Sequence, residues 1–292
     1  MHKFIPLALF FSLFFNQVGY AKQNQVAPIT TDNLTAKSWL VTDADGNIIA
    51  GENFYAVRRI ARVTKLVTVV TVLDSKAPLD KPLDLTLMNM SKKTKKVRRT
   101  PYDKLTRREL INLAMIRSDN TAARLLCQTY PTGYNQCISD MNRKVHSLGM
   151  LSSVLYDPTG LDDRNKSTAT DLVKLAQAAV NYPEVVAASS QSHLKIKIKK
   201  HWFIGNNTNP LIGNRHDIQV SKTGWTTQAG GCIIMLMDTD KGRRIVVVLG
   251  SKSIKTRIPE AEFISGIDED PVVIPESIND SGKRTFFGFK IF

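Results

Sequence analysis

The chain has 292 residues, of which 42% are hydrophobic and 23% are charged, so it can bury a sizeable core in one large or two small domains. This composition excludes a largely disordered chain. The formal net charge of +14 favours anionic partners.

Residues 1–21 have the pattern of a secretory signal peptide. Lys3 gives a basic start, an apolar run covers residues 4–15, and the small residue Ala21 precedes the expected cleavage point. An uncleaved anchor helix is the weaker alternative, because the run is shorter than the roughly 20 residues that a membrane span needs. We therefore expect a protein of the bacterial periplasm, with residues 22–36 as a lead-in segment.

Export narrows the anionic partners that the charge allows. Nucleic acid is the usual alternative at a sequence pI near 9.7, and export argues against it. Cell-wall carboxylates, phosphorylated envelope glycolipids and polyanionic wall polymers remain. One dense cationic stretch, residues 92–99, is either a solvated loop, as charge runs usually are, or a docking patch for such a polyanion.

The first predicted elements are a hairpin and a helix. Residues 38–42 and 48–50 flank a turn at residues 43–47, which predicts a β-hairpin. A helix is predicted over residues 58–73, and it is apolar from Leu66 onward, as in a helix buried between layers.

A lobe of helices is predicted next. Thr106 and Glu109 form a capping box that opens a helix, and the end of this helix delivers Ser118. Further helices are predicted over residues 121–128, 134–148 and 167–181.

Three cysteines make an odd count for an oxidising compartment. Cys127 and Cys137 flank a turn at residues 131–133, so a bridge is feasible if their Cα separation falls in the narrow range that a disulfide demands. Cys232 lies in an apolar run and is expected to be a small buried hydrophobe. No Cys/His spacing resembles a metal site, and no cofactor is expected.

From His193 the periodicity changes to that of strands. Residues 194–199 alternate apolar residues with lysines, which either guard a sheet edge or bind substrate. Further strands are predicted over residues 218–222, 232–237 and 244–249. Strands at both chain ends and helices between them predict a mixed α/β fold of the α+β kind, an antiparallel sheet from both ends with an inserted helical lobe.

Three short motifs carry the candidate chemistry. Lys65, Ser118-Asp119-Asn120 and Lys222-Thr223-Gly224 follow the order of the S-x-x-K, S-x-N and K-T-G motifs of penicillin-recognising active sites. In S-x-x-K the serine stands one helical turn before the lysine, which can take its proton. Here that position is Arg62, whose guanidinium offers only donors and cannot attack a carbonyl.

The resemblance extends beyond these motifs, from about residue 38 to residue 249. Matching blocks include residues 146–150, 220–226 and Asp157-Pro158-Thr159-Gly160-Leu161. On these residues the chain resembles the D-alanyl-D-alanine endopeptidases and carboxypeptidases of the low-molecular-mass penicillin-binding proteins, in particular their short, soluble endopeptidase-type branch. The resemblance implies the penicillin-recognising serine hydrolase, or β-lactamase-like, fold.

The resemblance also implies roles for the matching residues. Lys65 would be the general base, while Ser118 and Asn120 would relay protons and orient the substrate amide.

The K-T-G strand would bind the substrate. Lys222 and Thr223 would hold its terminal carboxylate, Gly224 would belong to the same substrate-binding strand, and the backbone N–H of Trp225 would be one oxyanion donor. The other oxyanion donor would be the backbone N–H of residue 62.

Loss of the serine decides the expected function. Removing the serine of a serine hydrolase costs about 10⁶ in turnover. We expect a peptidoglycan-directed homologue in cell-wall remodelling that is catalytically silent and binds peptidoglycan peptides, another cell-wall enzyme or an anionic envelope polymer. The alternative is an active D-alanyl-D-alanine endopeptidase or carboxypeptidase, if Arg62 is a sequence error.

Two other classes fit less well. A β-lactamase needs an acid that activates the deacylating water, and no clear candidate is present. A general polyanion-binding protein would leave the retained Lys65, Ser118, Asn120 and Lys222 unexplained.

The predicted organisation is a signal peptide, a lead-in segment, a D-alanyl-D-alanine peptidase-like domain over residues 37–260 and a C-terminal tail over residues 261–292. Phe286, Phe287, Phe289 and Phe292 give this tail an aromatic end, which either adds a strand to the sheet or contacts a partner.

Overall fold

The computed structural model describes residues 30–86, 101–214 and 217–267. The predicted signal peptide, the cationic stretch at residues 92–99 and the phenylalanines of the tail lie outside these ranges. Within them, no helix combines the length and the apolar character that crossing a bilayer requires.

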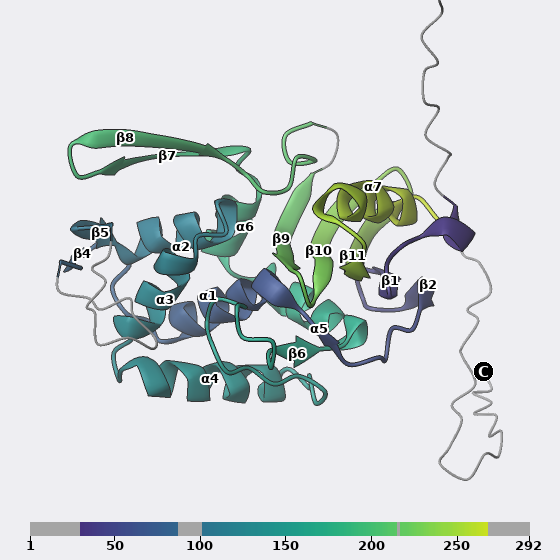
Figure 1. Ribbon diagram of the computed structural model, residues 1–292, viewed down its shortest axis with the longest axis horizontal. Coiled ribbons are helices and arrows are strands. Elements are labelled where there is room, and N and C mark those ends of the chain that lie inside the picture. Colours follow the sequence, from purple (N-terminus) through teal and green to yellow (C-terminus); the bar gives the residue numbers. More distant parts are fainter. Residues whose placement is uncertain (1–29, 87–100, 215–216, 268–292) are drawn as a thin grey trace, which may run out of the picture.

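A five-stranded antiparallel sheet joins the two ends of the described chain (Figure 1). Its order is β2-β1-β11-β10-β9. Strand β1 pairs with β11 from Ser38↔Leu249 to Asp43↔Arg244, so the predicted sheet built from both chain ends is confirmed. The strands are β1 (Ser38–Asp43), β2 (Ile48–Glu52), β9 (Ile218–Thr226), β10 (Gly230–Thr239) and β11 (Gly242–Ser251).

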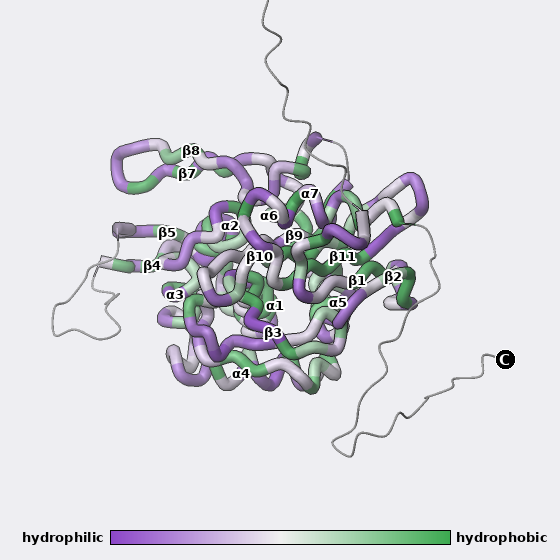
Figure 2. Tube along the Cα trace, turned by 45° about the vertical axis from the view of Figure 1, so that its right-hand side comes forward, coloured by the Kyte–Doolittle hydropathy of each residue, from purple (hydrophilic) through white to green (hydrophobic). Residues whose placement is uncertain are grey.

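Both faces of this sheet are buried, which explains why its central strands are apolar at nearly every position. Successive side chains of a strand point to opposite faces. On β10, Cys232 and Ile234 therefore belong to the core shared with the helical lobe, while Ile233 and Met235 belong to a second core. Figure 2 shows the hydrophobic colour running through β10 and β11 at the centre of the molecule.

The helices form a lobe around α1, which is buried at every position from Thr64 to Val72. This helix packs against α2, α3, α4 and α5, while α5 also covers one face of the sheet and α7 the other. The helices are α1 (Thr64–Asp74), α2 (Arg107–Ile116), α3 (Asn120–Gln128), α4 (Tyr134–Ser147), α5 (Ala169–Ala179), α6 (Pro183–Ser189) and α7 (Ile254–Ser265).

Short strand pairs and single turns complete the described fold. The β7–β8 hairpin extends away from the body beside α2 in Figure 1, with Leu194 and Ile196 buried and Lys195 and Lys197 exposed. The remaining elements are η1 (Thr31–Asn33), β3 (Arg58–Arg59), η2 (Ala61–Val63), β4 (Pro82–Asp84), β5 (Lys104–Thr106), β6 (Lys166–Ser167), β7 (His193–Ile198) and β8 (His201–Asn206).

The helix predicted over residues 58–73 starts six residues too early. Arg58 and Arg59 form β3, which pairs with β6, and a 3₁₀ turn separates them from α1, which begins at Thr64. Sequence periodicity could not show this boundary, because the partner strand lies about a hundred residues further along the chain.

Two helices were missed near the strands. The predicted helix ends before Pro183 as expected, at Ala179, but Pro183 also begins α6, since proline is common at the first helical position. Helix α7 carries Pro259 in its interior, where proline is usually excluded, and it crosses the predicted domain boundary at residue 260. The division into segments otherwise stays a prediction.

A disulfide joins Cys127 at the end of α3 to Cys137 on α4. Their Cα atoms lie 5.4 Å apart, inside the range that disulfides require. Cys232 is fully buried and has a free thiol, as expected. The bridge ties two neighbouring helices of the lobe together.

Replacing both bridged cysteines by alanine should lower the free energy of unfolding by about 2–3 kcal/mol. The bridge restricts the unfolded chain to a closed loop, and without it the unfolded state regains the conformational entropy of a loop of this length. Thermal unfolding with and without dithiothreitol measures the effect. The reductant should lower the melting temperature of the wild type and leave that of Cys127→Ala/Cys137→Ala unchanged. Equal melting temperatures for the oxidised and the fully reduced wild type would contradict the prediction.

Candidate active site

The backbone of residues 60–62 is wedged between a loop and a strand, both of which present glycine to it. A Cβ built on Gly224 of β9 would lie 2.9 Å from the Arg62 nitrogen, and one on Gly160 would overlap the Ala61 carbonyl oxygen. Ala61 itself has φ +45°, which is strained for a residue with a side chain. The backbone of residue 62 is thus held against the K-T-G strand.

Lys65 lies one turn further along, fully buried on α1. Its Nζ donates hydrogen bonds to Asn120 Oδ1 at 2.8 Å and to the Thr159 carbonyl at 2.6 Å, both of them neutral acceptors. Burial, and after it the charge of Arg62, lower the pKa of Lys65 to about 7 against the opposing charges of Asp157 and Asp119. Close to neutral pH, this amine can therefore both take and give a proton.

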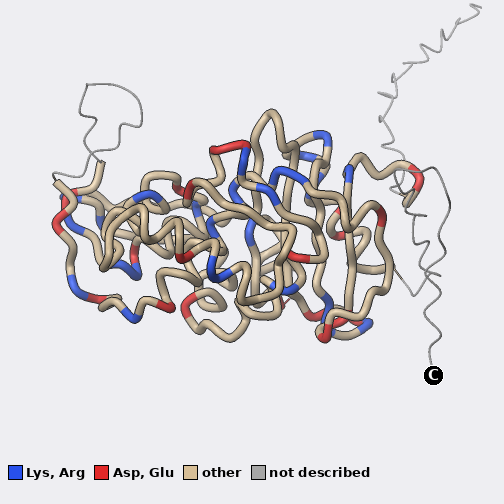
Figure 3. The backbone as a smooth tube through the Cα atoms, turned by 90° about the horizontal axis from the view of Figure 1, so that it is seen from below, with Lys and Arg blue, Asp and Glu red and all other residues tan. Residues whose placement is uncertain are grey.

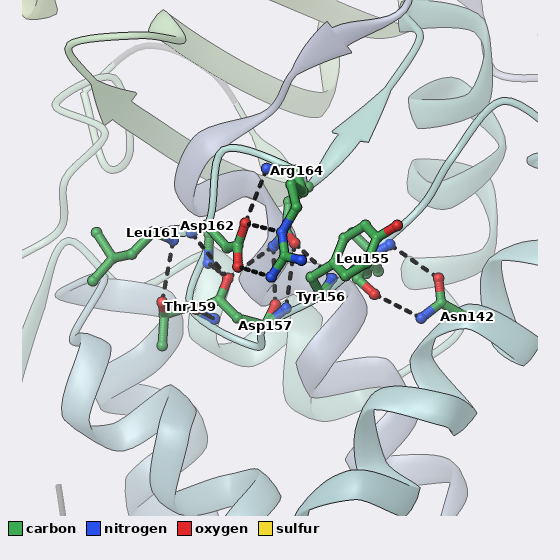
Figure 4. A network of polar contacts seen from close by, with 10 residues as sticks. Asn142, Leu155, Tyr156, Asp157, Thr159, Leu161, Asp162 and Arg164 are labelled. Carbon is green, nitrogen blue, oxygen red and sulfur yellow. Dashed lines mark hydrogen bonds and ion pairs between the residues drawn. The ribbon is translucent and has the colours of Figure 1, made fainter. Parts of the chain in front are cut away.

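The loop that holds the Thr159 carbonyl is built around Asp157 (Figure 4). The buried Asp157 carboxylate accepts hydrogen bonds from the Gly160 nitrogen at 3.0 Å, from Asn165 Nδ2 at 2.9 Å and from the Thr159 hydroxyl. Thr68 Oγ1 on α1 binds the Pro158 carbonyl at 2.8 Å. These bonds fix the loop against the helix that carries Lys65.

Ser118-Asp119-Asn120 forms the junction between α2 and α3. Asp119 caps α3 by accepting a hydrogen bond from the Ala122 nitrogen at 2.7 Å. Ser118 has φ +54°, another strained conformation of a kind that clusters at functional sites. The sharp turn places the Ser118 hydroxyl and the Asn120 amide toward the same region as Lys65.

Lys222 of β9 completes the group. Its Nζ donates to Ser118 Oγ at 2.9 Å and to the Thr223 carbonyl at 2.9 Å. Burial lowers the pKa of Lys222 well below its ordinary value, and the charges of Lys65, Arg257 and Arg62 lower it further.

A cleft of about 260 Å³ opens beside these residues. Arg257 lies at its wall, only 6% exposed, and donates from Nη1 to the Gly224 carbonyl at 2.7 Å. The Nε atoms of Arg62 and Arg257 are both buried without an acceptor in the described part of the chain. The cleft is lined by Arg62, Ser118, Thr208, Thr223, Gly224, Trp225, Ile254 and Arg257.

The structure brings all of the sequence-predicted site residues together. Lys65 contacts Asn120, Lys222 contacts Ser118, and Thr223, Gly224 and Trp225 line the cleft. Arg62 lines the cleft as well.

Several residues of the site, Ile254 among them, were not predicted. Arg257 escaped notice because α7 was not foreseen, although the Ser253 and Thr256 capping box marks its start. Thr208, which accepts a hydrogen bond from Thr223 Oγ1 at 2.7 Å, lies in a loop with no distinguishing pattern. Thr159 was quoted as part of a matching block and given no role. Among the described residues, no group of His, Cys, Asp and Glu could hold a metal ion.

Comparisons with known proteins agree with this geometry. A family model described as D-alanyl-D-alanine carboxypeptidase matches residues 22–253. A D-alanyl-D-alanine endopeptidase of Pseudomonas aeruginosa is 36% identical over 233 residues, which cover 78% of this chain and 75% of that protein. A D-alanyl-D-alanine endopeptidase of Escherichia coli is 30% identical over 274 residues, covering 92% of this chain and 88% of that protein.

Solved structures confirm the predicted fold class. Penicillin-binding protein D2 of Listeria monocytogenes, in its cefotaxime-bound form, superposes with a TM-score of 0.69 at 26% identity and covers 80% of this chain and 96% of that one. The Streptomyces K15 DD-transpeptidase superposes with a TM-score of 0.71 at 22% identity, covering 81% and 98%.

Replacing Arg62 by alanine should raise the pKa of Lys65 from its value of about 7, because a nearby cation that disfavours the ammonium form is removed. An NMR titration of ¹³C-labelled lysine measures the midpoint. Between pH 7 and 10.5 the unfolded chain holds this proton more tightly than the native protein, so stability contributed by Lys65 rises with pH in that window. The substitution should raise the lower limit of this pH range, because that limit is the pKa of Lys65 in the native protein.

Arg59→Ala is the matched control, because it removes one exposed cation nearby that does not contribute to the shift of Lys65. Its midpoint should stay at the wild-type value. An unchanged or lowered midpoint in Arg62→Ala would show that the guanidinium does not act on Lys65.

Proposed function

The chain belongs to the D-alanyl-D-alanine carboxypeptidase family, and we propose that it is a catalytically silent member that binds D-alanyl peptides of the cell wall without cleaving them. The observation that carries the proposal is Arg62 at the position of the nucleophile. A guanidinium has no lone pair free to attack a carbonyl and stays protonated at all accessible pH values.

The neighbouring hydroxyls do not supply a substitute. Ser118 Oγ belongs to the S-x-N turn and is held there by a hydrogen bond that it accepts from Lys222 Nζ at 2.9 Å. Thr64 Oγ1 donates to the Ala61 carbonyl at 2.8 Å and accepts from Asn165 Nδ2 at 3.2 Å, so it is held in the loop contact. The covalent step of the family mechanism therefore lacks a nucleophile.

Binding chemistry is retained. Arg257 and Thr223 line the cleft together with Arg62, and a carboxylate suits two guanidinium groups because each can donate paired hydrogen bonds. The two Nε atoms that lack acceptors would gain them from such a ligand. We infer that the terminal carboxylate of a D-alanyl peptide is held here without covalent attachment.

The family and the charge support a place for this binding. Two relatives are D-alanyl-D-alanine endopeptidases by name, and a signal-like start with a net charge of +14 suits an exported protein that contacts the anionic wall. We place the protein in the periplasm, bound to peptidoglycan peptides or to an enzyme that acts on them.

Incubation with a fluorescent penicillin should leave no label on the denatured protein, because residue 62 offers no hydroxyl to acylate. A peptide ending in D-alanyl-D-alanine should still bind reversibly, as measured by isothermal titration calorimetry. Label that survives denaturation and maps to this cleft would instead support an active enzyme. Absence of peptide binding would remove the binding role.

Replacing Arg62 by serine should restore covalent penicillin labelling and some D-alanyl peptidase activity, because Lys65 already contacts Asn120 and Lys222 already contacts Ser118. Mass spectrometry of the labelled peptide and an assay of released D-alanine measure the outcome. Arg62→Ala is the matched control, since it removes the same cation without adding a hydroxyl, and it should stay unlabelled. A folded but inert Arg62→Ser protein would mean that the site has diverged beyond one residue.

A further inference from the structure

A second pocket adjoins the cleft and is separated from it by Trp225, which lines both. It measures about 510 Å³ and lies at one end of the sheet, where β1 begins, β11 ends and the β9–β10 turn passes. Five cationic residues line it: Lys37, Arg58, Arg59, Lys166 and Lys252. We call it the cationic pocket. Among the described residues that line it, none is acidic.

Several cations outside this pocket have a carboxylate partner. Figure 3 shows basic and acidic residues distributed over the described backbone, and Arg108, Arg143, Arg164 and Arg243 each form an ion pair with an aspartate. In the described part of the chain, no carboxylate lies within ion-pair distance of the five cations of the cationic pocket.

Strand pairing makes the concentration of charge costly. Arg59 on β3 stands directly opposite Lys166 on β6 in the antiparallel register. Like charges directly opposite each other in a sheet are destabilising. The fold therefore holds two cations together at a position where an oppositely charged pair would be more stable.

The pocket also holds an unsatisfied donor. Arg58 Nε is buried and has no acceptor among the described residues, while its Nη2 makes only a long bond of 3.4 Å to the Lys37 carbonyl. A buried donor left without a partner costs free energy that a bound acceptor would return. Lys37 is positioned by Gly250, because a Cβ at that glycine would lie 2.9 Å from the Lys37 Cβ atom.

We propose that the cationic pocket binds a phosphate-bearing anion. A phosphate group carries more charge in a smaller volume than a carboxylate, which suits five clustered cations, and its oxygens match the paired donors of two arginines. Thr227 and Gln228 add uncharged side chains at the rim. Because Trp225 is shared with the cleft, a ligand in the cationic pocket lies against the wall of the peptide-binding site.

Isothermal titration calorimetry with pyrophosphate at fixed ionic strength tests the site. Arg59→Ala/Lys166→Ala should weaken pyrophosphate binding by about tenfold or more, since each cation makes charge-assisted bonds to the ligand. The matched control is Lys195→Ala/Lys197→Ala, which removes the same charge from exposed positions on β7. The control should bind within about twofold of the wild type, as screened distant charges contribute little.

Two further arms make the result decisive. Arg62→Ser alters the cleft and should leave pyrophosphate affinity unchanged. Citrate, which carries carboxylates in place of phosphates, should bind more weakly than pyrophosphate. Equal losses of pyrophosphate affinity in the pocket and control variants would show that only the overall charge matters. A loss in Arg62→Ser alone would show that the ligand binds in the cleft. Tighter binding of citrate than of pyrophosphate would overturn the phosphate assignment.

Thermal unfolding checks that the variant folds. Arg59→Ala/Lys166→Ala relieves a like-charge pair and should melt at or above the wild-type temperature in the absence of ligand. Pyrophosphate should raise the melting temperature of the wild type and of the control, but not of the pocket variant, because only a native state that binds the ligand is stabilised by it. An equal rise in all three proteins would refute the site.

Discussion

The close approach of three backbone segments is the constraint on which the site depends. Gly160 and Gly224 leave no room for side chains where the loop and β9 meet residues 60–62, and Ala61 takes a left-handed conformation to pass between them. Helix α1 starts two residues later, so this contact also fixes where the helix that carries Lys65 begins. The position of residue 62 is therefore set by its surroundings, whichever side chain it carries.

The lysines beside the cleft are buried around that backbone, and burial disfavours their charged forms. Lys65 and Lys222 are fully buried, and their hydrogen-bond partners are neutral oxygens, so neither ammonium group is balanced by a contacting carboxylate. Their lowered pKa values express that cost. Arg62 adds another cation to a region that already disfavours positive charge, which is a poor arrangement for stability and a suitable one for capturing an anion.

The cleft and the cationic pocket differ in how their cations are held. In the cleft, Arg257 is buried and anchored to the Gly224 carbonyl, so its position is set before any ligand arrives. In the cationic pocket, Lys37, Arg59, Lys166 and Lys252 are exposed and can adjust to a ligand. Trp225 lines both sites and is the residue that they share.

The sequence alone determined the order of the elements and the identity of most site residues. Apolar runs and, for residues 194–199, alternation marked the strands. Capping boxes marked helix starts such as Thr106 on α2, and the ordered motifs identified Lys65, Ser118, Asn120 and Lys222, because these signals are local. Only the tertiary structure decided the rest. Arg257 enters the cleft from a helix that packs on the far face of the sheet, and the opposition of Arg59 and Lys166 arises from strand pairing between distant segments. Such contacts depend on which faces are buried together, and no local pattern in the chain records that choice.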